Sequence, residues 1–330
     1  MIRDGLDPAA VADAATVLAG GELVAFPTET VYGLGARADD DAAVARVFAR
    51  KGRPSDHPLI VHVDGRAQAE AFAATLPAVA ARLVEAFWPG PLTVIVPRRE
   101  GIASAAAGGE PTIGLRCPAH PVAHALLVAA RAAGVPGLAG PSANRFGRVS
   151  PTTAAHVEQE LGRDLFVLDG GACRVGIESA IVDCSREAVG PVLLRPGVLG
   201  RARLEEAAGV RFADADAPAA KAPGTLAAHY APRATVRLMA GPMLRAALSI
   251  LGEERIRLAV YSRSIPSGVA PGVVQRRMPA RPEQAAHELY TVLREFDDAG
   301  MRLIWIEEPP AEADWDGVRD RLTRAAAATG

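Results

Sequence analysis

Short apolar runs alternate with amphipathic segments along the chain, which is the pattern of an α/β protein. Runs of strand length occur at residues 23–26, 59–63, 92–96, 112–116, 135–139 and 165–168. Apolar residues at helical spacing predict helices over 8–19, 41–50, 68–87, 121–133 and from about 153. The third of these helices contains Pro77, so we expect it to be broken or kinked there.

The composition changes after residue 208, which predicts a second domain. Residues 209–233 contain few large apolar groups and resemble a linker. From residue 235 the pattern is strand, helix, strand, followed by a helix over 282–299, a strand over 302–306 and a helix from about 315. This alternation predicts a small parallel sheet. We therefore predict a first domain over 1–208, a linker over 209–233 and a small α/β domain over 234–330.

The linker holds two residues that a free tether does not need. His229 and Tyr230 stand in the stretch Ala222-Pro223-Gly224 to Pro232, among small residues. Because loops that carry aromatic and titratable groups commonly serve a site, we interpret this stretch as a lid.

A dense polar set lies between the first two apolar runs. It comprises Thr28, Glu29, Thr30, Tyr32, Lys51, Arg53 and His57. Pro27 ends the first strand, and Gly33 and Gly35 are expected to allow tight turns close to a ligand. The arrangement predicts a binding site at strand ends.

Lys51 is the most informative single residue of this set. The chain has 36 Lys plus Arg, yet Lys occurs only at positions 51 and 221. A lysine beside Arg53 indicates a site that needs a compact ammonium, which suits a phosphate oxygen or a small anion. Taken singly, Lys51 could be a chance surface lysine, Arg53 a solvated surface cation and His62 a satisfied strand histidine.

Further polar residues follow other predicted strands. Strand alternation places Thr112, Gly114 and Arg116 on one face, and the guanidinium of Arg116 suits a carboxylate or a phosphate. An ordinary buried salt bridge is the alternative for Arg116. The small residues from Gly140 to Asn144 suit the approach of a phosphate to the backbone.

Two serines have structural as well as functional interpretations. Ser150 precedes the helix that starts near 153, so it could line the site or cap that helix. Ser179 stands in Gly176-Ile177-Glu178-Ser179, which is not the Gly-x-Ser-x-Gly nucleophile elbow. We interpret Ser179 as a hydrogen-bonding group.

Composition and charge indicate which partners and which cell compartment to expect for this chain. The net charge of −2 gives no global basic field that would recruit nucleic acid. Three widely spaced cysteines without a Cys-x-x-Cys pair indicate neither a disulfide framework nor a structural zinc site. The N-terminus lacks the pattern of a secretory signal, and no apolar run approaches the roughly 18 residues of a membrane span. We expect a cytoplasmic protein with no membrane association.

These motifs together resemble the YrdC-like threonylcarbamoyl-AMP synthase family. The resemblance rests on Pro27-Thr28-Glu29-Thr30-Val31-Tyr32-Gly33-Leu34-Gly35, on Lys51-x-Arg53-Pro54, and on Pro58-Leu59-Ile60-Val61-His62. The Pro223-Gly224 to His229-Tyr230-Ala231-Pro232 stretch resembles the linker of the two-domain members. The resemblance implies a twisted, open mixed sheet with helices, plus a small Rossmann-like α/β C-terminal domain.

The resemblance also implies an activity, its substrates and its partners. Members make L-threonylcarbamoyl-AMP and diphosphate from L-threonine, bicarbonate and ATP, for the threonylcarbamoyladenosine of tRNA. Mg²⁺ would be bound through the ATP phosphates, with no dedicated metal site in the protein. A downstream tRNA threonylcarbamoyl transferase complex would take the product, and stable binding of nucleic acid is not expected.

The family's site residues map onto matching positions of this chain. The expected catalytic residues are Lys51 and Arg53. The expected L-threonine site comprises Thr30, His62, Arg116, Gly140 and Ser179. The expected ATP site comprises Arg53, His57, Thr112, Ser142, Asn144, Ser150, Arg195 and Tyr230.

The chain departs from the family at two places, and two other functions stay open. His57 stands where Asn is frequent, and Thr225 to Ala228 replaces a bulkier stretch of some members. One alternative is a non-catalytic RNA-binding module, which the charge and the lack of stacking aromatics disfavour. The other is a carbamoyltransferase of the same fold, whose zinc-finger cysteine pairs are missing here.

Overall fold

The computed structural model describes residues 1–186, 188–214, 220–251, 257–266, 268 and 272–328. The chain divides into two compact units. The first unit comprises Met1–Phe146 and Ser150–Thr225, and the second comprises Gly147–Val149 and Leu226–Gly330. The division after Thr225 falls inside the predicted linker, whose residues 215–219 lie outside the described residues.

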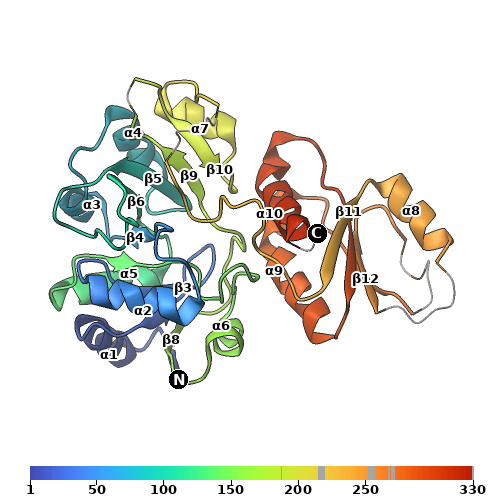
Figure 1. Ribbon diagram of the computed structural model, residues 1–330, viewed down its shortest axis with the longest axis horizontal. Helices are drawn as coiled ribbons and strands as arrows, with labels where there is room; N and C mark the ends of the chain where they lie inside the picture. Colours follow the sequence, from blue (N-terminus) through green and yellow to red (C-terminus); the bar gives the residue numbers. More distant parts are fainter. Residues whose placement is uncertain (187, 215–219, 252–256, 267, 269–271, 329–330) are drawn as a thin grey trace. The chain divides into compact units, whose positions relative to one another are not determined.

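One mixed sheet organises the first unit (Figure 1). Over the described residues its order is β1-β8-β2-β3-β7-β4-β6-β5-β9-β10. Pairing is antiparallel between β2 and β3 and between β5 and β6, and parallel between β4 and β6. This confirms the predicted mixed α/β sheet. The strands are β1 (Ile2–Asp4), β2 (Val24–Phe26), β3 (Gly33–Arg37), β4 (Ile60–His62), β5 (Leu92–Pro97), β6 (Thr112–Arg116), β7 (Leu138–Ala139), β8 (Phe166–Asp169), β9 (Ala180–Asp183) and β10 (Val192–Arg195).

The helices of the first unit begin and end at recognisable signals. Asp40 caps the helix that delivers Lys51, because its carboxylate accepts from the backbone N–H of Ala42 and Ala43. The helix predicted over 68–87 is in fact two helices, and Pro77 is the residue before the second one. The helices are α1 (Pro8–Ala19), α2 (Asp41–Lys51), α3 (Arg66–Phe72), α4 (Ala78–Phe87), α5 (Pro121–Ala132), α6 (Ala154–Leu161) and α7 (Arg201–Ala208).

The two faces of the central strands have different environments. Val61, Val94 and Leu115 point into the main apolar core. Because successive side chains alternate between faces, Ile60, His62, Thr93, Ile95 and Arg116 point to the other face. His62 and Arg116 of the predicted site therefore lie on that face.

The glycines after the first strand have another role than the one expected. Gly33 and Gly35 belong to strand β3 rather than to tight turns. A Cβ on either residue would lie 3.0 Å from the ring of Phe26. The prediction of ligand-facing turns was wrong, because these glycines make room for an aromatic core side chain.

The second unit is a small parallel sheet with helices on both faces (Figure 1). Its described strands are all parallel in the order β11-β14-β12-β13, which confirms the predicted parallel sheet. Leu258 and Val260 pack with Leu244 and Leu248 of α8, whereas Tyr261 donates from the other face to Glu288 of α9. The elements are β11 (Thr235–Met239), α8 (Gly241–Ser249), β12 (Leu258–Ser262), β13 (Val274–Arg277), α9 (Pro282–Asp298), β14 (Leu303–Glu307), the 3-10 turn η1 (Ala313–Trp315) and α10 (Asp316–Ala327). None of the described helices is both long and apolar enough to cross a bilayer.

Candidate active site

Four strands bring polar side chains to one level of the open sheet face. His62 of β4 stands in register with Arg116 of β6. Thr93 of β5 lies beside Ser179, which precedes β9, and their hydroxyl oxygens are 2.9 Å apart. All four residues are at most 3% exposed. The structure therefore brings together three residues of the predicted L-threonine site and adds Thr93.

Arg116 forms a buried ion pair with Glu29. Its Nη2 lies 2.8 Å from Oε1 of Glu29, and both side chains are 4% exposed. The second carboxylate oxygen of Glu29 accepts from the backbone N–H of Ala119 at 3.0 Å. The salt bridge considered for Arg116 is thus present, and it fixes the direction of the guanidinium.

His62 is packed so that its imidazole stays neutral. The ring meets Phe26 edge-on at 5.5 Å between centroids. Burial, followed by the charge of Arg116, lowers the pKa of His62 to about 3. A Cβ on Gly140 would lie 3.0 Å from Nδ1 of His62, so only glycine fits beside this ring.

Replacing His62 by glutamine is expected to change how stability depends on pH. The folded-state pKa of His62 is lower than its unfolded value of about 6.5, so between these values the unfolded chain binds more protons. Stability should therefore fall as the pH drops from about 6.5 towards 4, by up to about 1.4 kcal/mol per pH unit from this group. Urea unfolding of His62→Gln should show a shallower pH slope. His124→Gln, on the exposed side of α5, is the control and should keep the wild-type slope.

Thr28 shapes the backbone that carries Thr30. Its Oγ1 accepts from the backbone N–H of Thr30 at 3.1 Å and donates to the carbonyl of Val31 at 2.6 Å. The hydroxyl oxygens of Thr28 and Thr30 are 2.8 Å apart. Thr28 therefore closes a local turn, and this turn sets the position of Thr30.

Arg195 joins Ser179 to Pro223 of the linker. Its Nε and Nη2 donate to the backbone oxygen and the hydroxyl of Ser179, at 3.0 and 3.2 Å. Its Nη1 donates to the carbonyl of Pro223 at 2.8 Å. Since Arg195 is only 2% exposed, these bonds are shielded from water.

The middle of the linker, around residues 220–222, covers an apolar patch on the same sheet face. We call the side chains of Ile60, Ile95 and Ile181 the isoleucine patch. Ala220 and Ala222 pack against it, and Lys221 pairs with Glu110 at 3.0 Å. Residues 220–225 therefore lie on the face that carries the site.

Tyr230 belongs to the second unit. Its ring stacks with Tyr290 at 5.8 Å between centroids, and the guanidinium of Arg321 lies 5.3 Å from its centre. Its backbone φ is +61°, a conformation that is uncommon for a bulky residue. Its contact with ATP, and the lid as a whole, stay predictions.

Lys51 holds the loop that follows β7. Its ammonium donates to the carbonyls of Ser142 and Asn144. The backbone N–H of Phe146 returns a bond to the carbonyl of Lys51 at 2.8 Å. Lys51 is 4% exposed, so the alternative of a chance surface lysine is wrong. Burial, and then the charge of Arg53, hold the pKa of Lys51 well below its usual value.

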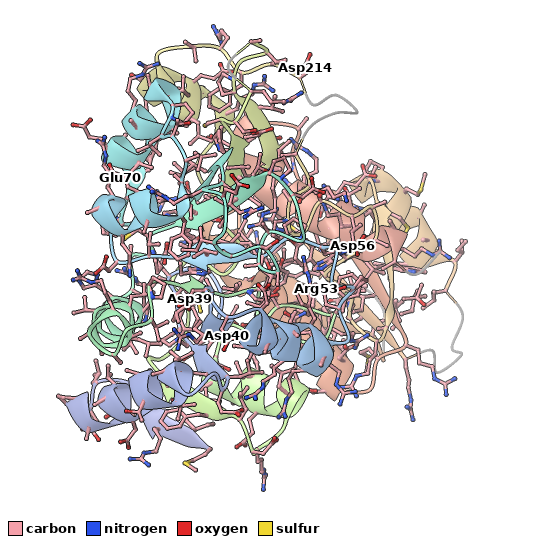
Figure 2. The ribbon with its side chains drawn as sticks, turned by 60° about the vertical axis from the view of Figure 1, so that its left-hand side comes forward. Asp39, Asp40, Arg53, Asp56, Glu70 and Asp214 are labelled. Atoms are coloured by element: carbon pink, nitrogen blue, oxygen red, sulfur yellow. The ribbon has the colours of Figure 1, made fainter. Side chains whose placement is uncertain are left out.

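Arg53 and His57 both lie against the aromatic ring of Phe146. The guanidinium of Arg53 is 5.7 Å from the centre of Phe146, and the ring of His57 is 5.6 Å from the same centre. Nη2 of Arg53 donates to the carbonyl of Pro58 at 3.0 Å. Figure 2 shows Arg53 in the loop after α2, next to Asp56. Burial and the positive charge of Arg53 lower the pKa of His57.

Thr112 lies away from the four-residue cluster. It shares a sheet face with Arg116 but stands at the other end of β6, about 13 Å along the strand. The structure thus separates Thr112, predicted for the ATP site, from the predicted threonine residues.

Ser150 is not a helix cap. Its hydroxyl donates to Oε1 of Glu178, a carboxylate that is 6% exposed. Thr153 caps α6 instead, because its hydroxyl accepts from the backbone N–H of His156. The capping alternative for Ser150 was wrong for this reason.

Thr93, Glu29 and Glu178 are parts of the site for which the sequence motifs predicted no role. Thr93 is the one hydroxyl-bearing residue inside the apolar run of β5. This isolated polar residue is the feature by which the sequence could have indicated it. The pairings of Glu29 with Arg116 and of Glu178 with Ser150 join residues far apart in sequence. In the residues that the structure describes, no group of three or more His, Cys, Asp or Glu is placed to hold a metal ion.

Comparisons with known proteins cover nearly the whole chain. The family model described as "Telomere recombination", for Sua5, YciO and YrdC proteins, matches residues 16–197. The model described as "Threonylcarbamoyl-AMP synthase, C-terminal domain" matches residues 188–327. Both matches agree with the resemblance found in the motifs.

Individual relatives give the same result. The threonylcarbamoyl-AMP synthase of Pyrococcus abyssi is 36% identical, with 98% of this chain and 96% of the relative covered. That of Bacillus subtilis is 37% identical, with coverages of 96% and 92%. The crystal structure of P. abyssi Sua5 complexed with L-threonine matches with a TM-score of 0.87 at 33% identity, over 100% of this chain and 97% of that one. The chain therefore belongs to the threonylcarbamoyl-AMP synthase family, in its two-domain form.

Proposed function

We propose that this chain is an L-threonylcarbamoyladenylate synthase, a nucleotidyltransferase that joins L-threonine, bicarbonate and ATP. The observation that carries the proposal is the buried cluster of His62, Thr93, Arg116 and Ser179. It lies in a chain that shares its whole fold with a relative crystallised with L-threonine. The product would serve the threonylcarbamoyladenosine modification of tRNA.

The threonine site needs one fixed cation and several neutral hydrogen-bonding groups. The guanidinium of Arg116, which Glu29 orients, suits the carboxylate of an amino acid. The neutral imidazole of His62 adds a hydrogen-bonding group without a second positive charge. Thr30 and Ser179 supply hydroxyls, and Gly140 leaves room for the His62 ring.

The ATP site would extend along the same face. The proposed ligands are Arg53, His57, Thr112, Ser142, Asn144, Ser150, Arg195 and Tyr230, with Lys51 beside Arg53. Lys51 acts here through the loop that it holds, because its ammonium already donates to the carbonyls of Ser142 and Asn144. Arg53 and Arg195 are the guanidinium groups suited to phosphate oxygens.

The chemistry requires positioning and neutralisation of charge. Bicarbonate gives CO₂ by losing one oxygen, which leaves as water with the proton that the amine of L-threonine releases as it adds to the CO₂. The product is a carbamate, and a carbamate oxygen attacks the α-phosphorus of ATP. The bond from this phosphorus to the bridging oxygen breaks, and diphosphate leaves with the electron pair. Negative charge spreads over phosphate oxygens in the transition state, so fixed cations and backbone N–H groups accelerate the step.

Mg²⁺ would be carried by the triphosphate of the substrate. An ion carried in this way is held mainly by phosphate oxygens and water. When bound, the ion neutralises part of the phosphate charge. A downstream tRNA threonylcarbamoyl transferase complex is the expected recipient of the product, and stable binding of nucleic acid is not expected.

Release of diphosphate tests the proposed function. Purified protein with ATP and Mg²⁺ should release diphosphate only when both L-threonine and bicarbonate are present. L-Serine should support much less release, because it lacks the methyl group of L-threonine. No release with any amino acid from a folded protein that still binds ATP would contradict the synthase and favour a binding role.

A further inference from the structure

The second unit contains a cavity that none of the predicted site residues lines. Its volume is about 840 Å³, which lies in the range of small-molecule sites. It opens at the carboxyl ends of β11, β12 and β14. Its lining comes from α8 along its whole length, the loop after β12 and the last residue of β14: Gly241, Pro242, Arg245, Ala246, Ser249, Ser264 and Glu307.

The cavity lies where the connections of the sheet change direction. β11 and β14 are parallel neighbours. After β11 the chain enters α8, which packs on one face of the sheet, and after β14 it enters α10, which packs with β11 and α9 (Figure 1). The two outgoing connections therefore part to opposite faces. Ligands of open parallel sheets bind in the crevice at such a point.

Glu307 is a carboxylate fixed at the edge of this crevice. It is 5% exposed. Its Oε2 accepts from the backbone N–H groups of Arg263 and Ser264 at 2.7 and 2.8 Å. Its Oε1 accepts from Nη2 of Arg263 at 3.2 Å. Because each carboxylate oxygen has two acceptor positions, Oε1 retains one for a donor in the cavity.

Gly241 lets three segments converge beside this carboxylate. A Cβ at Gly241 would lie 3.0 Å from Oγ of Ser264 and 3.2 Å from Oε1 of Glu307. The N-terminus of α8 has no side-chain cap. Pro242 has no N–H and Leu244 donates to the carbonyl of Ala240, so the N–H groups of Gly241 and Met243 are the ones that would serve an anion. One turn further on, Arg245 donates to the carbonyl of Ser264 at 3.3 Å and lines the same cavity.

We propose that this cavity binds a nucleoside monophosphate. The phosphate would lie against the start of α8 and Arg245, and a ribose hydroxyl would donate to Oε1 of Glu307. One ligand then meets both groups, since the donors face an anion and the carboxylate faces a hydroxyl group. The turn between β11 and α8 carries a single glycine, Gly241, rather than the Gly-x-Gly-x-x-Gly of dinucleotide sites. A single phosphate therefore fits this turn better than a diphosphate.

Hydrogen exchange on the full chain tests the proposal, with AMP and inorganic phosphate as probes. AMP should slow exchange at the backbone amides of residues 243–246, and inorganic phosphate should do so only at higher concentration. Arg245→Gln should weaken this protection by AMP about tenfold, because a charge-assisted hydrogen bond is lost. Arg237→Gln is the matched control, since Arg237 is an exposed arginine of β11 that does not line the cavity. It should behave as wild type.

A second variant and a measurement of hydrogen exchange in the first unit complete the test. Gly241→Ala should remove protection by AMP, because its methyl group enters the space between Ser264 and Glu307. Exchange at residues 140–146 reports separately on the proposed ATP site, so the two sites can be told apart in one experiment. The proposal is overturned if AMP leaves residues 243–246 unprotected, if neither variant changes the protection, or if inorganic phosphate protects as well as AMP.

Discussion

Replacing Glu29 by leucine is expected to lower the free energy of unfolding by about 3–5 kcal/mol, because it leaves the guanidinium of Arg116 buried without its counter-charge. Both side chains are 4% exposed, so water cannot replace the lost partner. Turnover that depends on L-threonine should fall at least about a hundredfold, since Arg116 loses its orientation. Urea unfolding and diphosphate release measure the two effects.

The double variant Glu29→Leu/Arg116→Met distinguishes a buried pair from two independent residues. Replacing both charges by apolar groups should cost less stability than Glu29→Leu alone, because no unpaired charge remains. Activity should stay lost. Additive losses of stability would contradict this account. Glu70→Gln, in the exposed pair with Arg66 (Glu70 is labelled in Figure 2), should change stability by less than about 0.5 kcal/mol.

Replacing Lys51 by methionine is expected to abolish turnover while most of the fold persists. The change removes the donor to the carbonyls of Ser142 and Asn144, both in the loop of the proposed ATP site. Two buried carbonyls without a donor should cost about 1–3 kcal/mol each. We expect the catalytic rate to fall at least about a hundredfold, because a misplaced site loop loses the alignment of the reacting groups.

The second lysine of the chain provides the matched control. Lys221→Met makes the same chemical change at an exposed residue that pairs with Glu110, and it should leave turnover within about twofold of wild type. Hydrogen exchange should show loss of protection around residues 142–146 in Lys51→Met only. Normal turnover together with normal protection in Lys51→Met would remove Lys51 from the site.

Helices and strands with a clear local repeat of apolar residues could be predicted from the sequence. The helices α1, α2 and α5 matched their predicted ranges to within a residue, because Asp or Pro at the start and Gly or small residues at the end mark them. The parallel sheet of the second unit followed from the alternation of strands and helices. The helix α7, with few apolar residues, gave too weak a period and was missed.

The site was predictable as a set of residues but not as a set of contacts. Local motifs named Thr30, Lys51, Arg53 and Arg116. They did not reveal that Lys51 bonds to loop carbonyls some 90 residues away, or that Glu29 is the partner of Arg116. Such pairings depend on which strands become neighbours, and one sequence without its fold does not specify that order. The glycines of β3 show the same limit, since glycine is needed there because the ring of Phe26 packs against them in the fold.

The isoleucine patch under Ala220 and Ala222 has a thermal consequence for the linker. Any movement of residues 220–225 away from the sheet exposes apolar side chains to water. Exposure of apolar surface carries a positive change in heat capacity, and the hydrophobic attraction that opposes it weakens on cooling. The free energy with which residues 220–225 pack on the sheet therefore depends on temperature. Cooling makes this packing less favourable, even though the hydrogen bond between Arg195 and Pro223 stays the same.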